Sequence, residues 1–274
     1  MMRLERERGL NQPEFSYRYY REFLNFLHRN FEIVQGKDVI SGTEKDVQLS
    51  PRIFLRHDVD VSPKHALEMA KIEFSEDVQS TYHFMVDSPM YSLDDPDTSA
   101  TIREIQSMGH EIGLHLNIGD NLRNSSYSFK DLEDRLVQDA HILEHATGMP
   151  VYSFSFHRQG EKIPGSHNQT IIHGTVNTFS SDMGTVSNGR YISDSRGEWT
   201  PDPMPALNQF AQTKALVQLV VHPIWWGESH MSAPARIVEF YTNLTRGKTP
   251  EYATEVEVRL RRTLPKFMQN IQLT

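Results

Sequence analysis

The chain has 274 residues and a formal net charge of -8, and it contains no cysteine. This length suits one large α/β domain better than two small ones. The negative charge argues against nucleic acid as a partner, and the lack of cysteine excludes disulfides and Cys-based zinc sites. The start of the chain has no apolar signal-type segment, and no stretch is apolar enough to span a bilayer, so we expect a cytoplasmic protein.

Strand-like and helix-like segments alternate along the chain. An aromatic-rich amphipathic helix is predicted at 13–31, and the polar segment 36–51 is interpreted as a loop. The repeated order of strand then helix predicts a mainly parallel α/β sheet, either open or closed as a barrel. In chain order, the elements predicted after the loop are a strand at 52–60, a helix at 62–74, a strand at 80–86, a helix at 98–108, a strand at 111–116, a helix at 129–146, a strand at 151–157, a long loop at 158–174, strands at 176–180 and 190–193, a helix at 208–213, a strand at 216–222, and helices at 233–244 and 252–268.

The strand at 52–60 carries two acids at its C-terminal end. Alternation of side chains puts Arg56, Asp58 and Asp60 on one face of this strand and the intervening residues on the other. Two carboxylates two residues apart can share a cation, or divide into a metal ligand and a general base. Taken alone, the pair is equally typical of a solvated turn before a helix capped by Ser62.

Other predicted strands also end in polar residues. His115, His157 and His222 each end a strand, while Asp194 and Arg196 follow another. Active sites of parallel α/β proteins form at the C-terminal ends of the strands, so these side chains are expected to converge. One such histidine is more often a structural hydrogen-bonding residue, but several together indicate a site. Histidine and aspartate without cysteine suit a divalent cation held by nitrogen and oxygen, most simply zinc.

Alternation also directs the histidines inward. In the strand that ends at His157, this histidine shares one face with Ser153 and Ser155, and the aromatic residues take the other. In the strand that ends at His222, the opposite face is formed by valine and leucine. We expect the apolar faces to pack outward against helices and the histidines to point inward.

Four short segments between Arg52 and Pro223 carry a recognisable pattern. They are Arg56-His57-Asp58-Val59-Asp60, Gly109-His110-Glu111-Ile112-Gly113-Leu114-His115, Phe156-His157-Arg158 and Val221-His222-Pro223. Together they resemble the polysaccharide deacetylase family, carbohydrate esterase family 4, and in particular a divergent branch with a His-Asp-Val-Asp first motif. The resemblance implies a distorted (β/α) barrel of mostly parallel strands, with an Asp-His-His metal site that hydrolyses N-acetyl groups on sugars.

The resemblance also implies a domain organisation and a metal site. We expect one domain over 1–274, with an N-terminal helix and loop at 1–51, a catalytic barrel core at 52–223 and C-terminal helices at 224–274. Asp60 and His115 are predicted to be metal ligands. The family's second ligand histidine would stand at Gly119, so His157 is predicted to replace it. His110 is the weaker substitute, because its odd offset places it on the opposite strand face from His115.

The remaining motif residues are assigned catalytic roles. Asp58 matches the family's general base, and Arg158 matches the arginine of the third motif, which we expect to keep Asp58 ionised. Asp194 resembles the residue of the fourth motif that orients the catalytic groups. His222 matches the general acid, because an imidazolium can donate a proton to the departing amine.

Three further residues are candidates for substrate binding. Trp225 and Trp226 follow His222 directly, and they are equally typical of a sugar-stacking wall and of core packing. Arg196 is predicted to contact the substrate from the segment after Asp194.

The implied function is metal-dependent removal of an acyl group, usually acetyl, from an N-acylated sugar or a sugar precursor of surface polysaccharide. Zinc is the simplest metal, with nickel and cobalt as alternatives. One other interpretation is a hydrolase of the same fold that acts on another non-peptide C–N bond, such as a cyclic ureide or a formamide. Another is a catalytically inactive carbohydrate- or nucleotide-sugar-binding protein, which Gly119 in place of a ligand favours.

Overall fold

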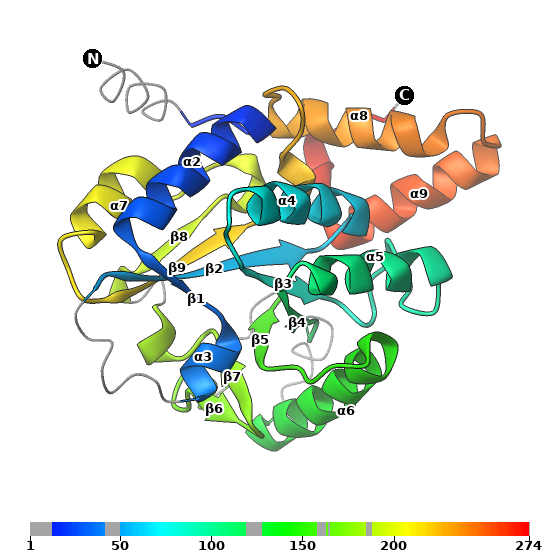
Figure 1. Ribbon diagram of the computed structural model, residues 1–274. Helices are drawn as coiled ribbons and strands as arrows, with labels where there is room; N and C mark the ends of the chain where they lie inside the picture. The colour runs from blue at the N-terminus through cyan, green and yellow to red at the C-terminus, as the bar shows by residue number, and fades with distance from the viewer. Residues whose placement is uncertain are drawn as a thin grey trace, which may run out of the picture.

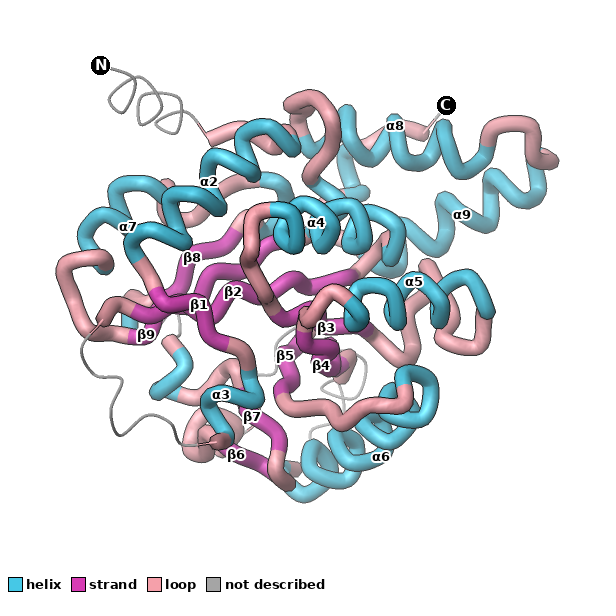
Figure 2. The backbone as a smooth tube through the Cα atoms, viewed as in Figure 1, coloured by secondary structure: helices cyan, strands magenta, loops and turns pink. Residues whose placement is uncertain are grey.

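A curled, mostly parallel β-sheet forms the centre of the molecule, with helices packed around it (Figure 1). The computed structural model describes residues 13–41, 50–118, 128–157, 163, 165–184 and 188–273. Eight strands follow the order β6-β7-β5-β4-β3-β2-β9-β8, and β1 pairs with β2. Among the described strands only the β6–β7 pair is antiparallel, and no pairing joins β6 to β8. The sheet is therefore an open half-barrel, which confirms the predicted fold class (Figure 2).

The described elements have the following bounds. The strands are β1 (Glu32–Val34), β2 (Arg52–Val59), β3 (Thr81–Phe84), β4 (Glu111–Leu116), β5 (Ser153–Phe156), β6 (Ile171–Ile172), β7 (Thr175–Asn177), β8 (Tyr191–Ser193) and β9 (Leu216–Val221). The α-helices are α2 (Tyr17–Asn30), α3 (Gly36–Ile40), α4 (Pro63–Ser75), α5 (Pro96–Ser107), α6 (Phe129–Thr147), α7 (Pro203–Phe210), α8 (Ala233–Thr245) and α9 (Pro250–Thr263). Within these ranges, none of the helices combines the length and apolar composition that crossing a membrane requires.

The predicted elements are present in the predicted order, and four segments differ from prediction. The short strand β1 at Glu32–Val34 was not predicted. The start of the predicted 36–51 loop forms α3, which is stabilised because the Asp38 carboxylate accepts the backbone N–H of Gln35. The helix predicted at 208–213 lies earlier, at 203–210, because Asp202 caps it and Pro203 stands at its first position. The predicted 158–174 loop contains the short strand β6.

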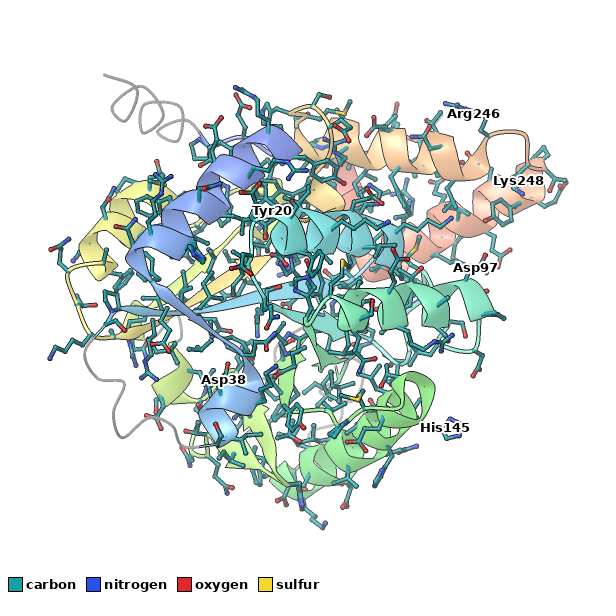
Figure 3. The ribbon with its side chains drawn as sticks, viewed as in Figure 1. Tyr20, Asp38, Asp97, His145, Arg246 and Lys248 are labelled. Carbon is teal, nitrogen blue, oxygen red and sulfur yellow. The ribbon has the colours of Figure 1, made fainter. Side chains whose placement is uncertain are left out.

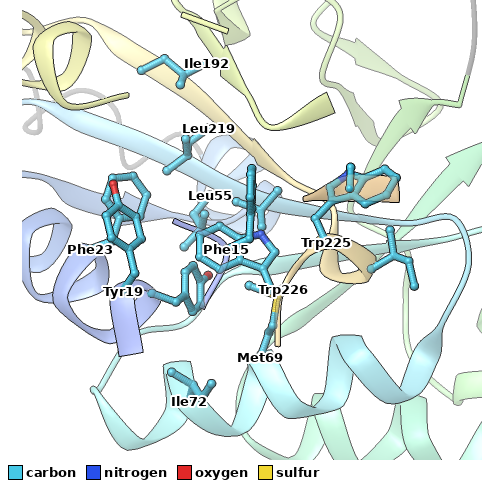
Figure 4. Packing of buried hydrophobic residues seen from close by; sticks show 14 of the residues in the cluster. Phe15, Tyr19, Phe23, Leu55, Met69, Ile72, Ile192, Leu219, Trp225 and Trp226 are labelled. Carbon is cyan, nitrogen blue, oxygen red and sulfur yellow. The ribbon is translucent and has the colours of Figure 1, made fainter. Parts of the chain in front are cut away.

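The two faces of β2 enclose different environments, as alternation predicts. Arg56 and Asp58 lie on the inner, concave face and form an ion pair of 3.2 Å. His57 lies on the outer face, which packs beneath α2 and α4. The apolar core on that side gathers aromatic rings around Trp226 (Figure 4). Those rings are Phe15, Tyr19, Tyr20 and Trp199, with centroids 5.3, 6.3, 4.9 and 6.2 Å from that of Trp226.

A buried carboxylate, Glu73 of α4, ties these helices to the sheet. Glu73 accepts hydrogen bonds from Tyr20, which reaches inward from α2 (Figure 3), and from Ser80 and Tyr82, both at 2.7 Å. His57 Nε2 lies 2.7 Å from the same carboxylate. Burial raises the pKa of Glu73, but the His57 charge and the hydrogen bonds outweigh burial and lower the pKa to about 2. The network fixes β2 immediately before Asp58.

Replacing Glu73 by alanine should strongly destabilise the fold. The Glu73→Ala variant leaves several buried donors without an acceptor, so the free energy of unfolding should fall by roughly 3–5 kcal/mol. Glu76→Ala, which breaks the partly exposed 3.3 Å pair with Arg21, should cost less than about 1 kcal/mol. Urea denaturation measures both values, and equal losses would contradict a structural role for the network.

The same network predicts a dependence of stability on pH. The pKa of Glu73 lies near 2 in the folded protein against an ordinary 4.5, so its contribution is complete above 4.5 and is lost as the pH falls toward 2. Acid should therefore destabilise the wild type more steeply than Glu73→Ala. Parallel slopes in this range would show that Glu73 does not carry the effect.

Candidate metal and catalytic site

Three side chains meet at the C-terminal ends of β2, β4 and β5. Asp60 Oδ1 lies 3.0 Å from His115 Nε2 and 3.0 Å from His157 Nδ1. The two imidazole rings stand at 85°, with centroids 5.2 Å apart. Because β3 lies between β2 and β4, it is the curl of the sheet that brings these residues together. Asp60, His115 and His157 are the three residues that the sequence predicts as ligands.

The donor set of these three residues fits a divalent cation. Their ligand atoms lie within 4.8 Å of one another. Burial raises the pKa of Asp60, but the charge of His157 and the hydrogen bonds of both histidines outweigh it and hold the pKa well below its usual range. One ionised carboxylate and two imidazoles are a combination that binds zinc with a coordination position left for water.

A second carboxylate, Asp58, is buried beside this triad. Its Oδ2 lies 3.2 Å from Arg56 Nη2, and its Oδ1 accepts a hydrogen bond of 3.2 Å from Ser155. His115 Nδ1 lies 3.8 Å from the same Oδ1 atom. Burial raises the pKa of Asp58, but Arg56 and then the nearby histidines outweigh it and lower the pKa to about 2. Asp58 is therefore ionised at neutral pH and able to accept a proton.

His222 and Asp194 form a third part of the site. Asp194 is fully buried, and its Oδ1 lies 2.7 Å from His222 Nδ1. The backbone N–H of His222 also donates to Asp194, at 2.9 Å. Burial lowers the pKa of His222, but the hydrogen bond and charge of Asp194 outweigh it and raise the pKa to about 9. His222 is thus an imidazolium at neutral pH, with Nδ1 engaged and Nε2 left for another partner.

A hollow lies along β8 and the segment that follows it. Arg196 is exposed and lines this hollow together with Tyr191, Ser193 and Ser195. The contact between Arg196 and a substrate stays a prediction.

Trp225 and Trp226 do not form a stacking wall for a sugar. The two residues are only 2% and 0% exposed, so neither ring offers a face to a ligand. Trp226 packs among the aromatic rings beside α2 (Figure 4). Its Nε1 donates to Asp194 Oδ2 at 2.9 Å. The burial of both rings agrees with the packing interpretation. The hydrogen bond from Trp226 helps to fix the position of the Asp194 carboxylate.

Two predicted site positions, Arg158 and Gly119, lie outside the described residues. Among the described residues, Arg56 of β2 forms an ion pair with Asp58. Alternation had already placed Arg56 on the face of Asp58, so the signal for this pair was present in the sequence.

The alternative ligand His110 lies away from the triad. Its Nε2 lies 3.1 Å from the carbonyl oxygen of Ala70, and its Nδ1 accepts the backbone N–H of Ser80 at 3.2 Å. His110 belongs to the outer-face network of Glu73, where its Nδ1 lies 3.6 Å from the carboxylate. This position agrees with the opposite strand face that its odd offset predicts.

The comparisons with known proteins return deacetylase structures of the type that the sequence motifs resemble. No protein-family model matches the chain, and no curated protein matches it. A Streptococcus pyogenes deacetylase, PplD, in complex with acetate matches at 11% identity over 54% of this chain and 66% of its own, with a TM-score of 0.40. The peptidoglycan deacetylase PdaC from Bacillus subtilis matches at 15% identity over 79% of this chain and 98% of its own, with a TM-score of 0.38. A CE4 family pseudoenzyme from Bacillus anthracis matches at 12% identity over 80% of this chain and 62% of its own, with a TM-score of 0.35. The chain thus spans about two thirds of the length of the streptococcal and anthrax proteins, and the function proposed below rests on the geometry of its own site.

Removing the Arg56 charge should raise the pKa of Asp58. In Arg56→Met the buried carboxylate loses its guanidinium partner, so its pKa should rise above the wild-type value of about 2. Arg52→Met removes a charge four residues earlier on the same strand face and is the control. Carbon-13 NMR of the Asp58 carboxyl during a pH titration measures the shift. An unchanged pKa in Arg56→Met would contradict this assignment.

Proposed function

We propose that the protein is a metal-dependent hydrolase that removes an acetyl group from an N-acetylated sugar or sugar precursor. The observation that carries this proposal is the convergence of Asp60, His115 and His157 within 4.8 Å. Asp58, which is ionised, and His222, which is protonated, interact electrostatically and can supply a base and an acid.

Asp60, His115 and His157 would hold the cation, which when bound would polarise the amide carbonyl and lower the pKa of a water molecule. Asp58 accepts the proton of the attacking water, because Arg56 keeps its carboxylate ionised. Ser155 holds Oδ1 of that carboxylate in place by its hydrogen bond.

His222 donates a proton to the nitrogen that leaves. Its Nδ1 is engaged by Asp194, so the proton for the amine comes from Nε2. Asp194 is itself held by the backbone N–H of His222 and by Trp226, which fixes the direction of the imidazole. Because the pKa of His222 is about 9, the donor is charged across the neutral range.

The hollow lined by Arg196 is where we place the rest of the substrate. Its lining of tyrosine, serine and threonine side chains offers hydroxyl groups that can exchange hydrogen bonds with a sugar.

Metal binding should depend on the triad. Asp60→Asn, His115→Ala and His157→Ala should each lose most of the bound zinc, because each removes one donor from the set. His173→Ala is the matched control, since His173 is half-exposed and pairs with Glu133 at 3.3 Å away from the triad. Metal analysis after dialysis against zinc measures occupancy. Full occupancy in His157→Ala would place the third ligand elsewhere.

His222 should be required for catalysis but not for metal binding. His222→Gln should keep its zinc but slow hydrolysis of N-acetylglucosamine oligomers by roughly 10²–10⁴-fold, the usual contribution of a general acid. Unchanged turnover would make His222 structural, and loss of zinc would make it a ligand. Zinc binding by the wild type without turnover of any acetylated sugar would favour a binding protein.

The fall in rate at alkaline pH should follow the deprotonation of His222. In the wild type the alkaline limb of the pH–rate profile should fall near pH 9, where His222 loses its proton. Asp194→Asn removes the anion that raises the pKa of His222, so the limb should move to lower pH. A limb that stays in place in Asp194→Asn would show that another group supplies the proton.

A further inference from the structure

Ser155 of β5 joins the candidate ligands to the candidate base. This residue is fully buried and lies opposite His115 in the β4–β5 register. Its Oγ is 2.7 Å from His115 Nδ1 and 3.2 Å from Asp58 Oδ1. One hydroxyl therefore contacts both a proposed metal ligand and the proposed base.

The number of available protons determines how these bonds are directed. A serine hydroxyl has one proton to donate, and an ionised carboxylate only accepts. When Ser155 donates to Asp58, its oxygen must accept from His115, so His115 carries its proton on Nδ1. The lone pair is then on Nε2, the atom that lies 3.0 Å from Asp60 Oδ1.

The opposite direction of the Ser155–His115 hydrogen bond would leave His115 Nε2 without a lone pair for a metal. If Ser155 donated to His115 Nδ1, the imidazole proton would lie on Nε2 and point at Asp60. Asp58 Oδ1 would then no longer accept a hydrogen bond from the hydroxyl of Ser155. With a cation held at Nε2, His115 would carry its one proton on Nδ1, so Ser155 would accept that N–H and donate to the ionised Asp58.

We propose that Ser155 is a positioning residue that holds His115 in the Nδ1–H tautomer, with Nε2 directed to the metal position. This inference rests on the proposed metal-dependent function. A histidine that binds a metal usually donates its other ring N–H to a carboxylate, carbonyl or water, which fixes the tautomer. In this chain Ser155 accepts a hydrogen bond from that N–H, and its hydroxyl donates a hydrogen bond to the proposed general base, Asp58.

Ser153 provides a matched control within the same strand. It is two residues earlier, on the same inner face, and is also fully buried. Its Oγ is 3.0 Å from His83 Nε2 and donates to Glu111 Oε1 at 2.9 Å. Ser153 thus also bridges a histidine and a carboxylate, but neither belongs to the metal triad.

The first test compares zinc affinity in the two alanine variants. Ser155→Ala should weaken zinc binding by roughly 10–100-fold, the usual effect of losing a group that orients a metal ligand. Ser153→Ala should bind zinc as the wild type does. Competition with a chelating dye measures affinity, and thermal unfolding shows whether both variants are folded. Equal losses in the two variants, or wild-type affinity in Ser155→Ala, would overturn the inference.

The second test follows the Nδ1 proton of His115 and does not depend on turnover. Nitrogen-15 NMR of the zinc-loaded wild type should show this proton on Nδ1, because Ser155 accepts it. In Ser155→Ala the proton loses its acceptor and should exchange with solvent faster than in Ser153→Ala. Equal exchange rates in the two variants would overturn the inference. A wild type that binds no zinc would instead refute the proposed function.

Discussion

Asp58 and Asp60 place two ionised carboxylates inside the sheet at the end of β2, and the surrounding residues compensate for that charge. An ion buried without partners costs several kcal/mol or shifts its pKa until it becomes neutral. Asp58 stays ionised because Arg56 lies 3.2 Å away, and Asp60 because two histidines lie 3.0 Å from its Oδ1. The inner face of the sheet must therefore be polar, and the apolar residues of these strands face the helices.

The two faces of β2 show that a buried carboxylate is not by itself a site. Glu73 on the outer side is enclosed by tyrosine, serine and histidine side chains, which leave its oxygens with several partners and no room for a ligand. Asp60 differs, because its partners are themselves nitrogen donors that converge on one point. The first arrangement stabilises the fold, and the second has the geometry of a cation site. His57 and Asp58 are adjacent in sequence, so the outer network also fixes the strand that delivers the proposed base.

Period-2 alternation and the strand-end rule predicted the parallel sheet and the convergence of its strand-end residues, and the family resemblance singled out Asp60, His115 and His157 among them. Partner choice was harder to predict. Alternation places Arg56 and Asp58 on one strand face, but it does not say which of the nearby charges form a pair. The burial of Trp226 depends on α2, which packs over it from far away in the sequence (Figure 4). Helix α3 was missed because five residues are too few to display a helical period.

Anomalous X-ray scattering from zinc-soaked crystals would show whether the three strand-end residues form a cation site. We expect one strong peak at the zinc edge, bound by one oxygen of Asp60 and one nitrogen each of His115 and His157. Asp58 should lie beside this peak without being required for it. A crystal without a peak between these three residues, or with zinc held by other side chains, would show that they do not form the cation site.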